Sequence, residues 1–525
     1  MSRDRSGFRG QAVTNCDNKS VDARGRGSHL SNMARLRSLL MMVPAASLAA
    51  CAVGPNYRAA SPGALGVPDQ FSVAADQRAQ EDLTQWWTRF NDPLLTRLVE
   101  KARADNLDVA QAVSRLRQAH EALIQSRAQL FPQLSGSAGY SRSFDIAGAN
   151  TVTLPDGTVT TISRNSGDSF SVGGDVSYQV GLFGEVGRAI SASRAQYEGA
   201  GYDYATVLIS TDAEIARNYV LARAYQAQLA NARQSLAIQD DNLEIAGFRV
   251  QAGLVSSLDQ EQARASRAQT AASIPSIEQS YNQAVSRLGV LTGQAPGALK
   301  GEMEAVQPIP TAPADVAIGI PADTLRQRPD VRAAERSLAA AVEQIGIAEA
   351  QLYPGLSIGG SVSSNSTSIG NLFDMISGQL FANLAQTIFD GGRLRSQVRS
   401  NEAAAEASFA AYKGTVLTGL EDVENAVVAM NAAEERARQY AIALDAANNS
   451  AILSRAQYRA GLTDFTTLNT AESQLLSARN GLTQAKSDQA TALIQLYLAL
   501  GGGWDSTIAP TAPDTPATFQ PAEEQ

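Results

Sequence analysis

An internal duplication constrains the fold more than any other feature of this sequence. Residues 107–132 match residues 329–354 at a constant offset of 222, and both segments end in a similar phrase around a proline. The tripeptide Ala-Gly-Leu at 252–254 recurs at 460–462, and in each copy another glycine follows the first after 40 residues. Landmarks that recur in one order indicate that a unit of about two hundred residues occurs twice. The 525 residues are therefore expected to form two copies of one structure.

Each copy has the same predicted order of elements. A helix with apolar residues at helical spacing ends before the shared proline, and two strands follow. A very long alanine-rich helix comes next, over about 187–249 in the first copy and 394–457 in the second. At about 1.5 Å per residue, each could extend on the order of 90 Å. Turns at Gly253 and Gly461 then reverse the chain into return helices, the first with an expected capping box at Ser257.

The predicted strands alternate between an apolar, aromatic face and a serine-rich face. They cover residues 134–146 and 169–182 in the first copy, and about 356–363 and 380–388 in the second. One explanation is a small soluble sheet that packs on a core. The other is a membrane barrel with a lipid-facing exterior and a wet lumen, because bilayers accept only helices and closed barrels. Four strands cannot close a barrel, so the second explanation requires an oligomer.

Composition excludes several classes of function. The formal net charge of -9 argues against a general nucleic-acid binder, which needs a basic surface to displace counterions from phosphates. The chain has two cysteines, Cys16 and Cys51, and two histidines, His29 and His120. So few of these residues leave no basis for a disulfide framework, a zinc site or a histidine-based active site. The sequence therefore predicts a protein that is not an enzyme and that holds no metal or dissociable cofactor.

The N-terminus reads as a secretory signal. From Met33 the chain has two arginines, an apolar stretch and small residues before Cys51. Residues 48–51, Leu-Ala-Ala-Cys, resemble the bacterial lipobox, in which the cysteine is acylated and becomes the first mature residue. Ala52 follows the cysteine, which favours delivery to the outer membrane. Removal of residues 1–50, with eight basic and three acidic side chains, leaves 35 basic and 49 acidic residues and a net charge of -14.

The chain resembles the outer-membrane efflux factors of the TolC, OprM and NodT type, in particular the lipoprotein subunits of tripartite RND efflux systems. The phrases that carry the resemblance are Gly54-Pro55-Asn56-Tyr57, Trp86-Trp87-Thr88-Arg89-Phe90-Asn91-Asp92-Pro93-Leu94, Leu182-Phe183-Gly184, Arg328-Pro329-Asp330-Val331 and Ile388-Phe389-Asp390-Gly391-Gly392-Arg393. The family implies a mixed α and β membrane protein, a homotrimer in which each subunit gives four strands to a twelve-stranded transmembrane β-barrel. Long helical hairpins would form a periplasmic α-barrel.

The resemblance and the duplication together predict a domain organisation. The expected parts are a signal sequence (1–50), a lipidated N-terminal segment with an equatorial part (51–100), a first repeat (101–293), an equatorial connector (294–321), a second repeat (322–501) and a C-terminal tail (502–525).

The resemblance also assigns roles at the hairpin tips. Asp259 matches a family aspartate near the periplasmic aperture, and Tyr458 matches a tyrosine that helps to hold the closed state. An aspartate in the first turn of a helix is also stabilising through the helix dipole, whatever the function. The chain departs from the family at three positions of the gate, Thr463, Thr467 and Thr470, so an arginine–aspartate latch cannot be carried over. The gate is expected to rest on Asp259, Tyr458 and the packing of Leu468.

The tips themselves are expected to contact a periplasmic adaptor protein. They comprise Ala252, Gly253 and Leu254 in the first repeat, and Ala460, Gly461 and Leu462 in the second. The resemblance thus implies the exit duct of an RND-type pump, with an adaptor, an inner-membrane RND transporter and outer-membrane lipid as partners. Two alternatives remain open: a TolC-like duct for type I protein secretion, and a lipid-anchored periplasmic coiled-coil scaffold.

Overall fold

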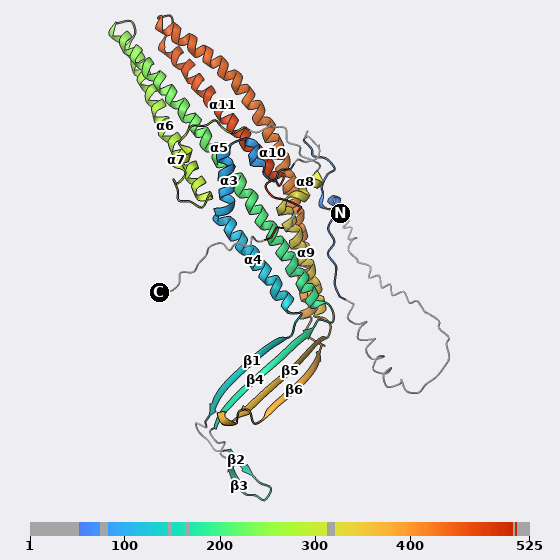
Figure 1. Ribbon diagram of the computed structural model, residues 1–525. Helices are drawn as coiled ribbons and strands as arrows, with labels where there is room; N and C mark the ends of the chain where they lie inside the picture. The colour runs from blue at the N-terminus through green and yellow to red at the C-terminus, as the bar shows by residue number, and fades with distance from the viewer. Residues whose placement is uncertain are drawn as a thin grey trace, which may run out of the picture. The chain divides into compact units, whose positions relative to one another are not determined.

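The computed structural model describes residues 52–73, 82–144, 150–162, 167–311, 321–507 and 510–511. The expected signal sequence and Cys51 lie outside the described residues. The described residues form one unit, with the helical hairpins at one end and a sheet at the other (Figure 1).

Two helical hairpins of equal dimensions form most of this unit. In the first, α5 (Glu185–Gln251) has 67 residues and α6 (Ser257–Leu291) has 35. In the second, α10 (Arg393–Arg459) has 67 and α11 (Phe465–Ala499) has 35. The long helices and their returns lie where the sequence predicts them. None of the described helices is both long and apolar enough to cross a membrane.

Shorter helices support the hairpins. They are α2 (Pro62–Leu65), the 3-10 turn η1 (Trp86–Phe90), α3 (Pro93–Asp105), α4 (Leu107–Ala128), α7 (Lys300–Met303), α8 (Pro321–Gln327), α9 (Pro329–Ala350) and the 3-10 turn η2 (Ile369–Asn371). The helices α4 and α9 are equivalent in the two repeats, and each has 22 residues. Along one layer the packing order is α4, α5, α9, α10.

The strands of the two repeats combine in a single antiparallel sheet with the order β1-β4-β5-β6. Their bounds are β1 (Gln133–Ser143), β4 (Gly167–Val180), β5 (Gly355–Ser366) and β6 (Ile376–Ala385). The last strand begins and ends earlier than expected, because its sequence lacks a regular alternation that fixes the limits. A separate hairpin of β2 (Asn150–Thr153) and β3 (Val159–Ile162) was not predicted.

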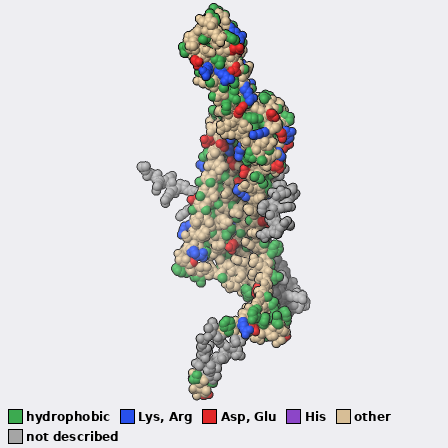
Figure 2. Space-filling view, turned by 90° about the vertical axis from the view of Figure 1, so that its left-hand side faces the viewer, with side chains coloured by type: hydrophobic (Ala, Val, Ile, Leu, Met, Phe, Trp, Pro, Cys, Tyr) green, Lys and Arg blue, Asp and Glu red, His purple; other side chains and the backbone are tan. Residues whose placement is uncertain are grey.

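Large apolar side chains of the sheet remain exposed (Figure 2). Those that the strand register places on one face include Leu134, Tyr140, Ile358, Val362, Ile376, Leu380 and Leu384. The aromatic rings of Tyr140 and Phe170 face each other across β1 and β4, with centroids 5.1 Å apart. Within one chain β1 and β6 are the edges of the sheet, and each has an unpaired side. The soluble-sheet explanation fails on this face, because no core covers it among the described residues.

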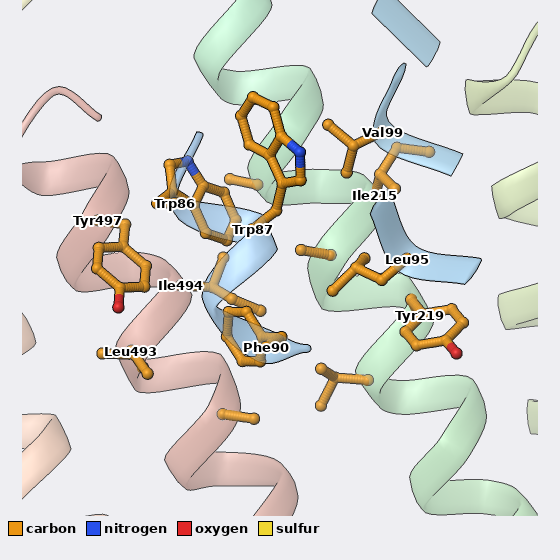
Figure 3. Close-up of a cluster of buried hydrophobic side chains, with 14 of the residues drawn as sticks. Trp86, Trp87, Phe90, Leu95, Val99, Ile215, Tyr219, Leu493, Ile494 and Tyr497 are labelled. Carbon is orange, nitrogen blue, oxygen red and sulfur yellow. The ribbon is translucent and has the colours of Figure 1, made fainter. Parts of the chain in front are cut away.

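The main core lies in the middle of the helical region (Figure 3). Trp86 of η1 stacks on Tyr497 of α11, with ring centroids 5.2 Å apart. Residues from η1, α3, α5 and α11 surround them, including Trp87, Phe90, Leu95, Val99, Ile215, Tyr219, Leu493 and Ile494. Segments from the beginning, middle and end of the chain therefore meet in one core.

Candidate functional site at the hairpin tips

Both hairpin tips have the same backbone structure. At the end of α5, Gly253 adopts φ +67° and donates to the carbonyl of Val250, while Leu254 donates to the carbonyl of Arg249. The amides of Gly461 and Leu462 make the equivalent bonds at the end of α10, with φ +76° at Gly461. This pair of hydrogen bonds is the Schellman motif, in which a glycine in the left-handed conformation allows the last carbonyls of the helix to be satisfied. Glycine is needed here because of its backbone conformation.

The return helices begin with side-chain caps. Ser256, and not Ser257 as the sequence suggested, caps α6 by accepting from the amide of Leu258. Asp259 then occupies the third helical position, where its charge faces the positive end of the helix dipole. In α11 the cap is Asp464, which accepts from the amide of Thr467 at 2.8 Å. Hydrogen bonds from Thr467 lower the pKa of the exposed Asp464 carboxyl.

A small apolar cluster holds the two tips together. Its buried members are Ala246, Ala263, Tyr458, Phe465 and Leu468. The rings of Tyr458 and Phe465 meet edge to face with centroids 6.0 Å apart. The structure therefore brings together two of the expected gate residues, Tyr458 and Leu468, in the interior of the subunit. Thr467 and Thr470 are exposed on the other side of α11, and Asp259 is half-buried.

Arg249 is a member of this site that the sequence did not reveal. Its guanidinium lies over the ring of Tyr458, 4.5 Å from the centroid, and donates to the Tyr458 carbonyl at 3.1 Å. Burial raises the pKa of Tyr458; the positive charge of Arg249 lowers it and the negative charge of Asp259 raises it. The contacts of Arg249 with the ring and with the carbonyl of Tyr458 are direct and join residues of two different helices. Arg249 thereby ties the end of α5 to the end of α10.

Ion pairs along the hairpins reinforce this contact. Arg459 pairs with Asp241 at 2.8 Å and links α10 to α5, and both side chains are more than half exposed. Arg455 of α10 pairs with the buried Glu472 of α11. Because exposed pairs contribute little, about 0–1 kcal/mol, the buried carboxylate is the more important of the two.

The outermost residues of the tips are open to solvent. Ala252, Gly253, Ala460 and Gly461 are exposed, and the Leu254 and Leu462 side chains are 70% and 78% exposed. Each hairpin thus has one exposed leucine, which forms a small apolar surface at its tip. Within the described part of the chain, no three His, Cys, Asp or Glu side chains gather closely enough to hold a metal ion.

Comparison with known proteins shows which family and which solved structures this chain resembles. Residues 98–294 and 320–502 match the family model described as outer membrane efflux protein. The chain is 32% identical over 468 residues to Nodulation protein T of Rhizobium leguminosarum bv. trifolii, which covers 87% of this chain and 96% of that relative. It is 29% identical over 473 residues to the pyoverdine export outer membrane protein OpmQ of Pseudomonas aeruginosa, with 90% and 98% covered. The solved structure of the outer-membrane channel OprN superposes with a TM-score of 0.77 at 29% identity, covering 86% of this chain and 100% of that one.

Proposed function

This chain belongs to the outer membrane efflux protein family and is an outer-membrane efflux channel, and from that premise we propose that three copies assemble into the exit duct of a tripartite RND-type pump. Members of this family are efflux channels and not enzymes. The finer proposal concerns the trimer, its partners, its lipid anchor and its gate.

The open edges of the sheet support a ring of subunits. The order of strands, β1-β4-β5-β6, continues in the order of helices, α4, α5, α9 and α10, so both layers end on the same two sides. The unpaired side of β6 in one subunit can therefore pair with β1 of the next. Such a head-to-tail contact generates a closed ring when the rotation closes. Three subunits would supply twelve strands, which exceeds the eight that known barrels require.

The helical edges carry matching apolar surface. Leu107 and Ile124 on α4 are 67% and 44% exposed, and Phe409 and Leu417, in the part of α10 nearer the sheet, are 37% and 45% exposed. Side chains of this size favour burial, at about 25 cal/mol per Å² of apolar area. Contact between α4 of one subunit and α10 of its neighbour would remove them from water along the periplasmic part of the duct.

The partners follow from the class of protein. One of the relatives named above, OpmQ, is an outer membrane protein of pyoverdine export. We expect this chain likewise to receive drugs or other small toxic compounds from an inner-membrane transporter through a periplasmic adaptor. The exposed Leu254 and Leu462 at the tips offer that adaptor an apolar contact. The outer-membrane position is to be held by acyl chains on Cys51, a modification that mass spectrometry of the N-terminal peptide can detect.

The gate is to lie at the tips. In a trimer, three Asp259 carboxylates would form a ring in a narrow mouth, where the low dielectric of the walls strengthens their attraction for cations. Tyr458 and Leu468 would hold the hairpins of each subunit in the closed position from inside. The exposed Thr467 and Thr470 would line the constriction without charge.

Detergent extraction, sizing and single-channel recording test this function together. The single observation that carries it is the open sheet with exposed apolar faces and two unpaired edges. A trimer with conductance is expected. A monomer without conductance would contradict the duct and favour a lipid-anchored scaffold. The double variant Leu254→Asp and Leu462→Asp should keep conductance in bilayers but fail to restore drug efflux in cells that lack the native duct.

A further inference from the structure

The segment that follows the expected lipidation site is fixed by one arginine of α5. Arg188 uses all five of its N–H donors. It donates to the carbonyls of Val53 at 3.1 Å, Gly54 at 2.9 Å and Pro55 at 2.8 Å, to Oδ1 of Asn56 at 3.1 Å and to Glu343 at 2.9 Å. Its side chain is only 5% exposed. A buried guanidinium with this many partners is a structural lock, because loss of any of them leaves a buried charge poorly satisfied.

Two glycines make room for this lock. Gly54 adopts φ +96°, and a Cβ there would lie 2.6 Å from the Cα of Gly346 on α9. A Cβ on Gly346 would in turn lie 2.6 Å from Nε of Arg188. The segment can therefore lie directly on α9 beneath the guanidinium only if both positions are glycine.

The two ends of the segment are also held. At the near end, the amide of Val53 donates to the carbonyl of Phe183 at 3.3 Å, and Ala52 packs against Gly184, the residue that caps α5. At the far end, the hydroxyl of Tyr57 donates to Glu335 at 2.9 Å. Each residue of the Gly54-Pro55-Asn56-Tyr57 phrase thus has a defined contact, and the segment lies where β4 passes into α5.

The lock occurs at only one of two equivalent junctions in the chain. The position that corresponds to Gly346 in the first repeat is Ile124, whose side chain would fill the space that the segment needs. The position that corresponds to Arg188 in the second repeat is Ser396, which cannot make five hydrogen bonds. The duplicated fold therefore offers one docking place per subunit.

We propose that Arg188, with Glu343 and Gly346, is a positioning clamp that fixes residues 52–57 at the junction of sheet and helices, so that the lipid anchor is held beside the strands. The proposal rests on the acylation of Cys51, part of the proposed function. Cys51 is joined to Ala52 by one peptide bond, and the Cα atoms of neighbouring residues are about 3.8 Å apart. Acyl chains on Cys51 would therefore be attached to the residue next to a fixed one. A clamped anchor would enter the membrane next to its own sheet, whereas a free one could sample a wide area.

Limited trypsin digestion of the purified full-length protein tests the clamp, because Arg58 is exposed immediately after the clamped residues. Cleavage there should be slow in the wild type and at least about tenfold faster in Arg188→Ala, since proteolysis follows the population of the opened segment. Gly346→Ile, which introduces the residue of the other repeat, should act in the same direction. Arg194→Ala, an exposed arginine on the same helix, is the control and should leave the rate unchanged.

The readouts separate the clamp from the duct. Equal cleavage rates in the wild type, Arg188→Ala and Gly346→Ile, all with wild-type helix content by circular dichroism, would overturn the clamp. Mass spectrometry of the released peptide reports acylation on its own; an unmodified Cys51 would overturn the lipid-positioning part even with cleavage protected. Failure of the duct would appear separately, as missing conductance with the protection at Arg58 intact.

Discussion

Asn106 and Arg328, which are 222 positions apart, make the same contact in the two repeats. Nδ2 of Asn106 donates to the carbonyl of Leu291, the last residue of α6, at 2.8 Å. Nη1 of Arg328 donates to the carbonyl of Ala499, the last residue of α11, at 3.0 Å. Different side chains thus satisfy equivalent helix ends, and each ties the start of its repeat to the end.

Substitution of these two residues should destabilise the protein to different degrees. Asn106 also caps α4, so Asn106→Ala should lower the free energy of unfolding by about 2 kcal/mol. Arg328 also pairs with Asp330 and Asp422, so Arg328→Ala should cost about 3 kcal/mol or more. Thermal unfolding followed by circular dichroism measures both. The control is Asn401→Ala, which removes an exposed hydrogen bond and should have little effect; equal losses in all three would refute the assignment.

Asp212 should make stability depend on pH. Its carboxylate is fully buried and paired with Arg103, and burial raises its pKa from 3.8 to about 6. Because the folded state binds this proton at higher pH than the unfolded chain, the contribution is present below pH 3.8 and is lost as pH rises through 6. Between pH 7.5 and 5, the unfolding free energy of the wild type should gain about 1 kcal/mol relative to Asp212→Asn. Parallel pH profiles of the two proteins would contradict the shift.

Arg249 should restrain the opening of the tips. Arg249→Ala removes both the contact with the Tyr458 ring and the bond to its carbonyl, together worth about 1–2 kcal/mol. The open fraction in single-channel recordings should rise about tenfold. Arg459→Ala breaks only an exposed pair and should change it much less. If the two variants behave alike, the ring contact is not what holds the tips.

Asp259 should set the ion preference of the mouth. Asp259→Ala should remove most of the cation preference and weaken the block by multivalent cations, because the focused negative field is lost. Glu261→Ala, two residues further along α6 with a 66% exposed carboxylate, is the matched control. Reversal potentials in asymmetric salt measure both. Wild-type selectivity in Asp259→Ala would leave the residue with its helix-dipole role alone.

The tip glycines should respond differently from a glycine inside a helix. Gly253→Ala places a side chain at φ +67° and should destabilise by about 1 kcal/mol, although nothing lies within 4 Å of the new Cβ. Gly414→Ala, in the middle of α10 and equally unobstructed, should stabilise by about 0.5–1 kcal/mol. Chemical denaturation of both variants tests whether backbone conformation alone explains why both tips have glycine at this position.

The elements that the sequence predicts well are those with local signals. The long helices end at glycines whose left-handed conformation stops a helix, and the alternation of Tyr140 and its neighbours identifies a strand. The short β2–β3 hairpin was missed because its strands have only four residues each. The start of α6 was misplaced by one residue because Ser256 and Ser257 are adjacent and only the hydrogen bond distinguishes them.

The functional contacts were less accessible from sequence. Arg249 reaches Tyr458 across 209 positions, and Arg188 reaches Val53 across 135. Nothing near either arginine in the sequence distinguishes it from the other arginines of α5. Such partners depend on how helices pack, and the packing is decided by the whole chain. Helical spacing can indicate that Leu468 lies on the buried face of α11. It cannot indicate that the Arg249 guanidinium lies over the Tyr458 ring.

The equal lengths of the two hairpins restrict how this protein can change during evolution. If a mutation removed two turns from α5 and α6 alone, the first tip would withdraw by about 10 Å from the second, and the cluster around Tyr458 could not form. A viable change in reach needs matched insertions or deletions at four places in the gene. The length of the periplasmic part of the duct is therefore expected to change rarely during evolution, while surface residues along it can vary.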